Sequence, residues 1–307
     1  DGQRLDKFML SQLKGVQKSL IYRVVRSGEV RVNKGRAHVD TRLQSGDEVR
    51  IPPIRYTEKE SEHSAPPLKL SEMPPILFED QNIMVVDKPA GMASHGGSGI
   101  SYGLIERMRA SRPELPFLEL VHRLDRGTSG VLVLAKTRKA LVRLHEMIRE
   151  GEMHKTYQAL VKGDWQNDRQ HAKFPLFKYV TPSGERRVRV DPENGLPSHS
   201  IFRLKERFGP VSLVEVDLLT GRTYQIREHA EELGFPLVGD EKYGDFAFND
   251  EVAHGSLGVP FKRMFLHSGK ICFHHPITGE ELEIEAPLPK DCVELIEVLE
   301  QRKAQNK

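Results

Sequence analysis

One segment of this 307-residue chain gathers many of the side chains that are able to do chemistry. Residues 120–130 read Leu-Val-His-Arg-Leu-Asp-Arg-Gly-Thr-Ser-Gly, so a single carboxylate, Asp125, stands between Arg123 and Arg126. Two glycines follow it and permit a tight backbone path before the apolar run 131–135, so we expect the aspartate on a turn at a strand edge. A functional carboxylate and an Asx-turn, in which the aspartate only caps its own loop, both fit this pattern.

The sequence carries no pattern typical of a metal or nucleotide site. His145-Glu146 is not followed by a second histidine four residues on, where Arg149 stands, and the thirteen histidines show no other ligand spacing. The glycine-rich run 95–99 is not followed by the Gly-Lys-Ser/Thr of a phosphate-binding loop, so we interpret it as a flexible surface loop beside a cleft. We therefore expect no metal and no cofactor.

At residues 122–130 the sequence resembles the pseudouridine synthases of the RluA family, whose motif reads His-Arg-Leu-Asp, two variable residues and Thr-Ser-Gly. Three further segments agree with the family in the same order: Lys-Thr-Tyr at 155–157, Gly-Arg-Thr-Tyr-Gln-Ile-Arg at 221–227, and the run 239–244. Tyr224 departs from the family, which usually carries histidine there, and Glu228 is less apolar than expected. The chain is most similar to a branch that modifies uridines of large-subunit ribosomal RNA.

The resemblance implies catalytic roles for three residues. Asp125 is the essential one, acting either as a nucleophile or as the base that removes a ribose proton. Arg227 pairs with this carboxylate, and a guanidinium beside an aspartate favours its charged form. Tyr157 stacks on the target base and takes the proton left on it, although for a strand tyrosine considered alone core packing is the better interpretation.

The resemblance also implies contacts with a uridine that is flipped out of its stack. Arg123 matches the residue that braces the gap, and Arg222 and Gln225 lie where they reach phosphates or base edges. A basic stretch fits RNA contact and solvated surface equally well. It consists of Arg186, Arg187 and Arg189.

The expected reaction is the isomerisation of uridine to pseudouridine in large-subunit (23S) ribosomal RNA, which needs no redox step. Three alternatives remain open at this point. They are the same reaction on another structured RNA such as tRNA, a noncatalytic RNA-binding protein of ribosome assembly, and a glycoside or nucleoside hydrolase. The hydrolase usually needs two cooperating carboxylates, and only Asp125 stands in a motif.

Charge divides the chain into a basic beginning and a nearly neutral remainder. Residues 1–55 have a net charge of +6 and the remainder has −4, so we expect an RNA anchor at the start, similar to S4 RNA-binding domains. Six prolines between positions 52 and 75 indicate a linker over 56–75, followed by a catalytic domain over 76–307. In the anchor, apolar spacing predicts two helices and then short strands with a turn at Lys34-Gly35. The polar face of the second helix is our candidate for gripping phosphates. It carries Lys18, Tyr22, Arg23 and Arg26.

The remainder alternates strand-like and helical segments joined by short turns, which predicts an α+β fold with a mixed, mainly antiparallel sheet beside the small α/β S4-like unit. We expect strands over 76–78, 83–86, 131–135, 157–161, 211–219, 265–273 and 282–284. We expect helices over 102–110, 139–148 and 223–233, and a closing helix after Pro289. The two cysteines, the absence of a long apolar run and the absence of a signal peptide pattern lead us to expect a cytoplasmic protein, away from membranes. We also expect a monomer.

Overall fold

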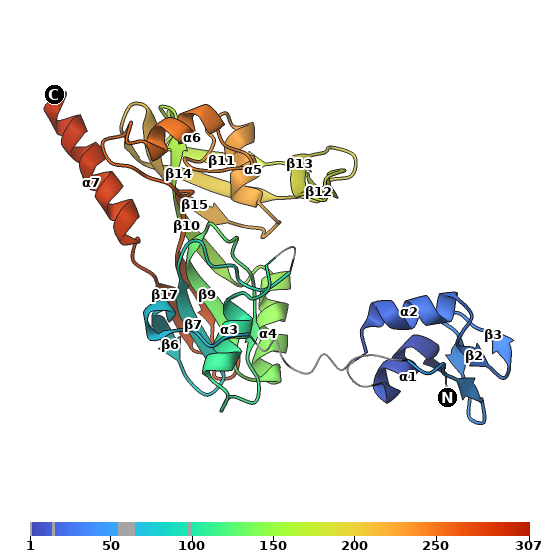
Figure 1. Cartoon of the computed structure of the whole chain (residues 1–307). Helices are drawn as coiled ribbons and strands as arrows, with labels where there is room; N and C mark the ends of the chain where they lie inside the picture. Colours follow the sequence, from blue (N-terminus) through green and yellow to red (C-terminus); the bar gives the residue numbers. More distant parts are fainter. Residues whose placement is uncertain (1, 14–15, 55–64, 98–99) are drawn as a thin grey trace. The chain divides into compact units, whose positions relative to one another are not determined.

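The computed structural model describes residues 2–13, 16–54, 65–97 and 100–307. The chain divides into two compact units, residues 1–64 and 65–307 (Figure 1). No helix in the described part of the chain is long and apolar enough to cross a membrane.

The first unit packs two short helices against small antiparallel sheets. Helices α1 (Leu5–Gln12) and α2 (Lys18–Arg26) contact each other and bury their apolar faces in a shared core. The strands are β1 (Gln3–Arg4), β2 (Arg31–Val32), β3 (Gly35–Arg36), β4 (Arg42–Leu43) and β5 (Val49–Arg50). β1 pairs with β4, and β2 lies between β3 and β5. The β2–β3 turn is at Asn33 and Lys34, both with positive φ as a two-residue hairpin loop requires, one residue earlier than expected.

In the part of the second unit that the structure describes, ten strands form one sheet. Its order is β11-β14-β15-β10-β16-β9-β7-β6, with β17 paired to β16 and β8 paired to β9. The strands are β6 (Ile76–Glu79), β7 (Ile83–Lys88), β8 (Glu119–Leu120), β9 (Ser129–Ala135), β10 (His154–Lys162), β11 (Arg169–Lys173), β14 (His199–Arg207), β15 (Val211–Leu218), β16 (Leu266–His274) and β17 (Glu281–Glu285). β16 and β9 are parallel, and the other pairings found in this sheet are antiparallel. The expected mixed, mainly antiparallel fold is confirmed.

Helices cover both faces of this sheet. Along β9, Leu132 and Leu134 belong to a core that also contains residues of α3 and α5, whereas Val131 and Val133 belong to a core shared with α4. A third core, behind β10 and β15, receives α6 and α7. The helices are α3 (Leu104–Ser111), α4 (Arg138–Arg149), α5 (Gln225–Glu232), α6 (Phe246–Ala253) and α7 (Lys290–Gln305). α3 and α5 therefore lie on the same face of the sheet.

Several elements were absent from the sequence expectations. The strands β11 and β14 were missed, and the arginines at 186–189 lie in a separate hairpin of β12 (Leu176–Val180) and β13 (Arg186–Val190). These strands carry many charged residues, because their exposed sides face solvent rather than a second layer. The alternating apolar pattern used for the other strands is correspondingly weak in them.

Residues 65–75 belong to the second unit, although the sequence placed them in the linker. Leu68 is buried in the core beside α3, and its backbone N–H donates to Ser111 Oγ at 2.8 Å. A short 3-10 helix, η1 (Leu70–Glu72), follows, and Glu72 forms an ion pair with Arg107 at 2.7 Å. The remaining expected linker residues, 56–64, lie outside the described residues.

Gly130 allows the parallel pairing that joins β9 to β16. Its φ is +117°, and a Cβ atom there would lie 2.1 Å from the carbonyl oxygen of Ser268, its partner in the register. We expect Gly130→Ala to lower the free energy of unfolding of the second unit by at least about 2 kcal/mol, because both strain and overlap must be relieved. Urea unfolding followed by the fluorescence of Trp165 measures this, since this buried residue is the single tryptophan of the chain.

Gly209→Ala is the matched control. Gly209 has a φ of +91°, but a Cβ atom there would have no other atom within 4 Å, so this substitution adds backbone strain without overlap. Equal losses of stability in the two variants would show that the close approach to Ser268 is unimportant.

Candidate active site

Asp125 lies in the loop between β8 and β9, which is pinned to the segment after β7. Ser94 Oγ donates to the carbonyl of Leu124 at 2.7 Å and accepts from its N–H at 3.1 Å. Gly91 and Arg126 also exchange two hydrogen bonds, of 2.8 and 2.9 Å. These bonds fix the backbone on both sides of Asp125, so the position of its carboxylate is set by the protein before any ligand binds.

The carboxylate of Asp125 faces Arg227, in the first turn of α5. Arg227 Nη1 donates to Asp125 Oδ2 at 3.3 Å. Among the described residues, the carboxylate accepts no hydrogen bond from the backbone of its own loop. The Asx-turn interpretation is therefore wrong. The structure thus brings together two residues that lie 102 positions apart in the chain.

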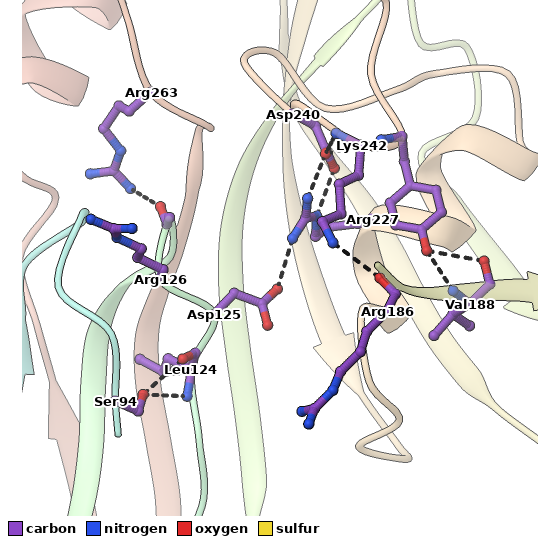
Figure 2. A network of polar contacts seen from close by, with 12 residues as sticks. Ser94, Leu124, Asp125, Arg126, Arg186, Val188, Arg227, Asp240, Lys242 and Arg263 are labelled. Atoms are coloured by element: carbon purple, nitrogen blue, oxygen red, sulfur yellow. Dashed lines mark hydrogen bonds and ion pairs between the residues drawn. The ribbon is translucent and has the colours of Figure 1, made fainter. Parts of the chain in front are cut away.

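Arg227 is held chiefly by a second carboxylate, Asp240, which the sequence analysis gave no role. Its Nε donates to Asp240 Oδ2 at 2.8 Å and its Nη2 to Asp240 Oδ1 at 2.7 Å, which makes a bidentate pair (Figure 2). Asp240 is fully buried and Arg227 is 8% exposed. The available signal was the family-like run 239–244, in which this aspartate follows a glycine.

Burial raises the pKa of Asp125 above the usual value for an aspartate. Arg227 and Lys88 act in the opposite direction, while the negative charge of Asp240 adds to the rise. The expectation that the guanidinium favours the charged form is right in sign, but the net direction of the pKa is upward. Burial is the largest cause, and the opposing effect of Arg227 is limited because two of its hydrogen bonds go to Asp240 and one, longer bond goes to Asp125.

A buried lysine lies beneath the same loop. Lys88, at the end of β7, is 0% exposed, and its ammonium donates to the carbonyls of Met92 at 2.6 Å, Pro89 at 3.0 Å and Arg126 at 3.3 Å. Burial lowers its pKa to about 7, and the charge of Asp125 opposes that change. The sequence analysis missed this residue, which is separated from the apolar run 83–86 only by Asp87.

Tyr157 lies on β10 in the core on the α3 and α5 side of the sheet. It is 7% exposed, and its hydroxyl is hydrogen-bonded to Ser268. Burial raises the pKa of this hydroxyl, and the negative charge of Asp125 raises it further. The tyrosine therefore packs in the core and also lies near enough to Asp125 to sense its charge.

The expected RNA contacts around Asp125 fall into different environments. Arg123 and Arg222 are exposed, and Arg222 Nε donates to the carbonyl of Pro197 at 3.0 Å. Gln225 is only 3% exposed, and its amide is used within the protein. Its Oε1 accepts from Thr220 and from the N–H of Arg222, and its Nε2 donates to Ser200 and to the carbonyl of His199. The interpretation of Gln225 as a direct RNA contact is therefore not supported by its geometry; it shapes the loop before α5.

The β12–β13 hairpin is attached to the loop that carries Asp240. Tyr243 Oη donates to the carbonyl of Val188 at 3.0 Å and accepts from its N–H at 2.6 Å, and Lys242 Nζ donates to the carbonyl of Arg186 (Figure 2). Arg186 and Arg189 are exposed, whereas Arg187 is half-buried and donates to the carbonyl of Lys242. The hairpin thus presents two of its three arginines to solvent.

The candidate phosphate-binding face of the first unit is largely accessible. Lys18, Arg23 and Arg26 on α2 are exposed, while Tyr22 is half-buried and donates its hydroxyl to Asp6 at 3.1 Å. A surface hollow of about 570 Å³ lies beside this face. It is lined by Arg4, Tyr22, Val25, Arg26, Arg36, Ala37, His38, Val39 and Asp40. In the described part of the chain, no cluster of three or more histidine, cysteine, aspartate or glutamate side chains is arranged to hold a metal ion.

Comparison with known proteins agrees with this arrangement. The RNA pseudouridylate synthase family matches residues 82–232, and the S4 domain family matches residues 3–49. A ribosomal large subunit pseudouridine synthase C from Salmonella typhi is 50% identical over 302 residues, which cover 97% of this chain and 93% of that protein. A protein of the same name from Pasteurella multocida is 49% identical over 309 residues, which cover 99% of this chain and 93% of the relative.

The solved structure of human RNA pseudouridylate synthase domain containing 1 has a TM-score of 0.58 and 26% identity, and the match covers 75% of this chain and 95% of that one. Human RNA pseudouridylate synthase domain containing 4, at 22% identity and a TM-score of 0.59, shares the fold. The resemblance that residues 122–130 indicated is thereby confirmed. Half of the residues are identical to those of named relatives across nearly the whole length, and the chain belongs to the RNA pseudouridylate synthase family.

Proposed function

We propose that this chain isomerises uridines of large-subunit ribosomal RNA to pseudouridine, with Asp125 as the essential residue. The observation that carries the proposal is the contact between Asp125, in the family-like run 122–130, and Arg227. Asp240 holds the guanidinium of Arg227 in place through two hydrogen bonds. The names of the relatives support ribosomal RNA as the substrate, and the S4 match supports RNA binding by the first unit.

The reaction breaks the bond between ribose and the base nitrogen, rotates the base in the site, and joins ribose to a base carbon. No electrons are lost or gained, so one carboxylate and a pocket that retains the base suffice. Arg227 holds Oδ2 of Asp125, and among the described residues no donor is found on Oδ1. Oδ1 is therefore the atom that attacks the substrate or removes its proton, and the arrangement serves either role.

The detached base rests against Tyr157. This residue is buried on the face of the sheet that α3 and α5 cover, and it lies close enough to Asp125 for the charge of that carboxylate to raise the pKa of the tyrosine hydroxyl. Arg123, exposed two residues before the aspartate, braces the space that the flipped uridine leaves in the RNA. Arg222 and the exposed arginines of the β12–β13 hairpin contact phosphates around the site.

A hydrolase is disfavoured by the state of the second carboxylate. Glycoside hydrolases use a pair of carboxylates that flank the bond to be broken. Asp240 is 0% exposed, and both of its oxygens are bound to Arg227, so it reaches neither water nor a sugar.

Since the described residues of one unit supply Asp125, Arg227 and Tyr157, we also propose that the protein acts as a monomer, in the cytoplasm where ribosomal RNA is made.

Replacing Asp125 with asparagine removes the negative charge and keeps the shape of the side chain. We expect Asp125→Asn to remain folded and bound to RNA but to lose more than about a thousandfold in turnover, since an essential catalytic group contributes several kcal/mol to the barrier. Tritium release from 23S ribosomal RNA labelled in its uracil rings measures turnover. Asp164→Asn, at an exposed aspartate outside the site, is the matched control. Activity of Asp125→Asn within tenfold of the parent is incompatible with the assignment.

The α2 face of the first unit is tested by charge removal in the full chain. We expect the triple variant Lys18→Gln, Arg23→Gln, Arg26→Gln to bind ribosomal RNA more weakly, with a flatter salt dependence, and to keep its turnover at saturating RNA. Each lost contact should change the slope of log K against log salt by about 0.7 for single-stranded or about 0.9 for duplex RNA. The measurement is a titration of one ribosomal RNA fragment across a salt series.

The control for this variant removes the same charge from another surface. Arg138, Lys139 and Arg149 are exposed on α4, on the face of the sheet opposite α5, and their replacement with glutamine should leave affinity and slope nearly unchanged. If both triple variants lose affinity equally, the α2 face has no special role. Replacing the ribosomal fragment with a tRNA in the same assay tests the alternative substrate.

A further inference from the structure

Tyr224, which directly precedes α5, has an unusual backbone conformation beside the candidate active site. It is the N-cap of α5 and has a φ of 54° and a ψ of 25°, in the left-handed region that bulky side chains rarely adopt. Its side chain makes no capping hydrogen bond to the helix. Neither helix capping nor backbone preference therefore explains a tyrosine at this position.

The conformation directs the ring of Tyr224 onto Arg227. The guanidinium carbon lies 4.8 Å from the centroid of this ring and 5.7 Å from that of Tyr243. The two rings are 6.1 Å apart and tilted by 56°. A planar guanidinium packs well against aromatic faces, and such contacts gain strength where water is excluded. Arg227 is thus restrained by two rings in addition to its bidentate pair with Asp240.

The ring of Tyr224 also lies near a second cation. Lys242 Nζ is 5.1 Å from its centroid, and the same ammonium donates to the carbonyl of Arg186 on the β12–β13 hairpin. The tyrosine therefore stands where α5, the loop 239–244 and the hairpin meet. Because Tyr224 is half-buried, its ring keeps water from one side of the guanidinium.

We propose that Tyr224 is a positioning residue for Arg227, whose ring orients the guanidinium toward Asp125. This inference rests on the proposed function of the site. Asp240 fixes Nε and Nη2 of Arg227, but the contact of Nη1 with Asp125 is a single bond of 3.3 Å, so a small rotation of the group weakens it. The ring limits that rotation and leaves the reacting carboxylate in one electrostatic environment.

A positioning role for the ring of Tyr224 predicts a different result from a role in packing alone. Loss of the ring loosens the contact that favours the charged form of Asp125, so the pKa of that carboxyl should rise further. Activity that requires the carboxylate is lost as pH falls through this pKa, and the acidic limb of the rate profile should therefore move to higher pH. Other titratable and charged groups face Arg227 or its neighbourhood and also influence the pKa of Asp125, so they are left unchanged in every variant. They are Lys88, Arg187, Glu228, Glu231, Asp240, Lys242 and Tyr243, and burial raises the pKa of Glu228 to about 8.

The test compares three substitutions in the full chain. Tyr224→Phe keeps the ring, Tyr224→Leu removes it but keeps apolar bulk, and Tyr224→Asn removes it with a residue that tolerates the left-handed backbone. We expect Tyr224→Phe to stay within about twofold of the parent. We expect the other two to react about tenfold more slowly at saturating ribosomal RNA, with an unchanged RNA concentration at half-maximal rate. Tyr224→Asn keeps the test valid if the leucine variant does not fold.

A second readout follows the carboxyl group without any reaction. In protein carrying ¹³C-labelled aspartate, the resonance of Asp125 is assigned by its loss in Asp125→Asn, and its titration in the absence of RNA gives the pKa directly. We expect this pKa to be higher in both ringless variants than in the parent and in Tyr224→Phe. Equal pKa values in all four proteins would overturn the inference, as would a loss in Tyr224→Phe equal to that in Tyr224→Leu.

The two readouts separate this inference from the proposed function. If the parent forms no pseudouridine but the titration shifts as expected, the proposed function fails and the positioning role stands. If the parent is active and the ringless variants change only the RNA concentration at half-maximal rate, Tyr224 contacts RNA rather than positioning Arg227, and the inference is wrong.

Discussion

The buried ion pair between Arg227 and Asp240 is the interaction on which the arrangement of the site depends. Asp240 accepts two hydrogen bonds from Arg227 and further bonds from the N–H groups of Lys242 and Tyr243. Removing charges from water is costly unless every polar atom finds a partner, and here the carboxylate is fully paired. The same loop binds the β12–β13 hairpin, so one ion pair fixes α5, the loop and the hairpin as well as the direction of the guanidinium toward Asp125.

The second requirement is that the Asp125 loop does not move relative to this pair. Hydrogen bonds from the end of β7 and the segment after it hold the loop in place. The Lys88 ammonium donates to three carbonyls, one of them in the loop, and Ser94 and Gly91 also donate to carbonyls of the loop. The parallel join of β9 to β16 begins a few residues after Asp125 and connects the half of the sheet that holds the loop to the half that holds α5. Asp125 and Arg227 come from the two halves that this join connects, and the join itself requires a glycine at position 130 because a Cβ atom there would overlap the carbonyl oxygen of Ser268.

The sequence predicted elements and residues that show a characteristic local pattern. It did not predict the roles of polar side chains that become buried only when the chain folds. Asp125 and Arg227 were selected as candidates because they lie in runs that resemble the family, and the structure brings the two side chains together. Most strands and helices were predicted from their apolar periodicity. Gln225 was misjudged, because a glutamine in a polar run looks exposed until the fold encloses it. Asp240 and Lys88 received no role for the same reason: a buried charge is recognised by its partners, and those partners are distant in the chain.

The opposing influences on the pKa of Asp125 suit the catalytic role that we propose for it, in which the carboxylate must be both charged and reactive. A carboxylate paired on both oxygens with a guanidinium is strongly stabilised and correspondingly weak as a base or nucleophile. In this chain Asp240 takes the bidentate position, and Asp125 receives one bond on Oδ2. Burial raises the pKa of Asp125, which increases the basicity of its ionised form, while Arg227 and Lys88 keep part of the balance on the charged side. If Asp125 is the reacting carboxylate that we propose, dividing the guanidinium between it and Asp240 leaves Oδ1 of Asp125 free for the ribose, and it makes the angle of Arg227 matter for the reaction.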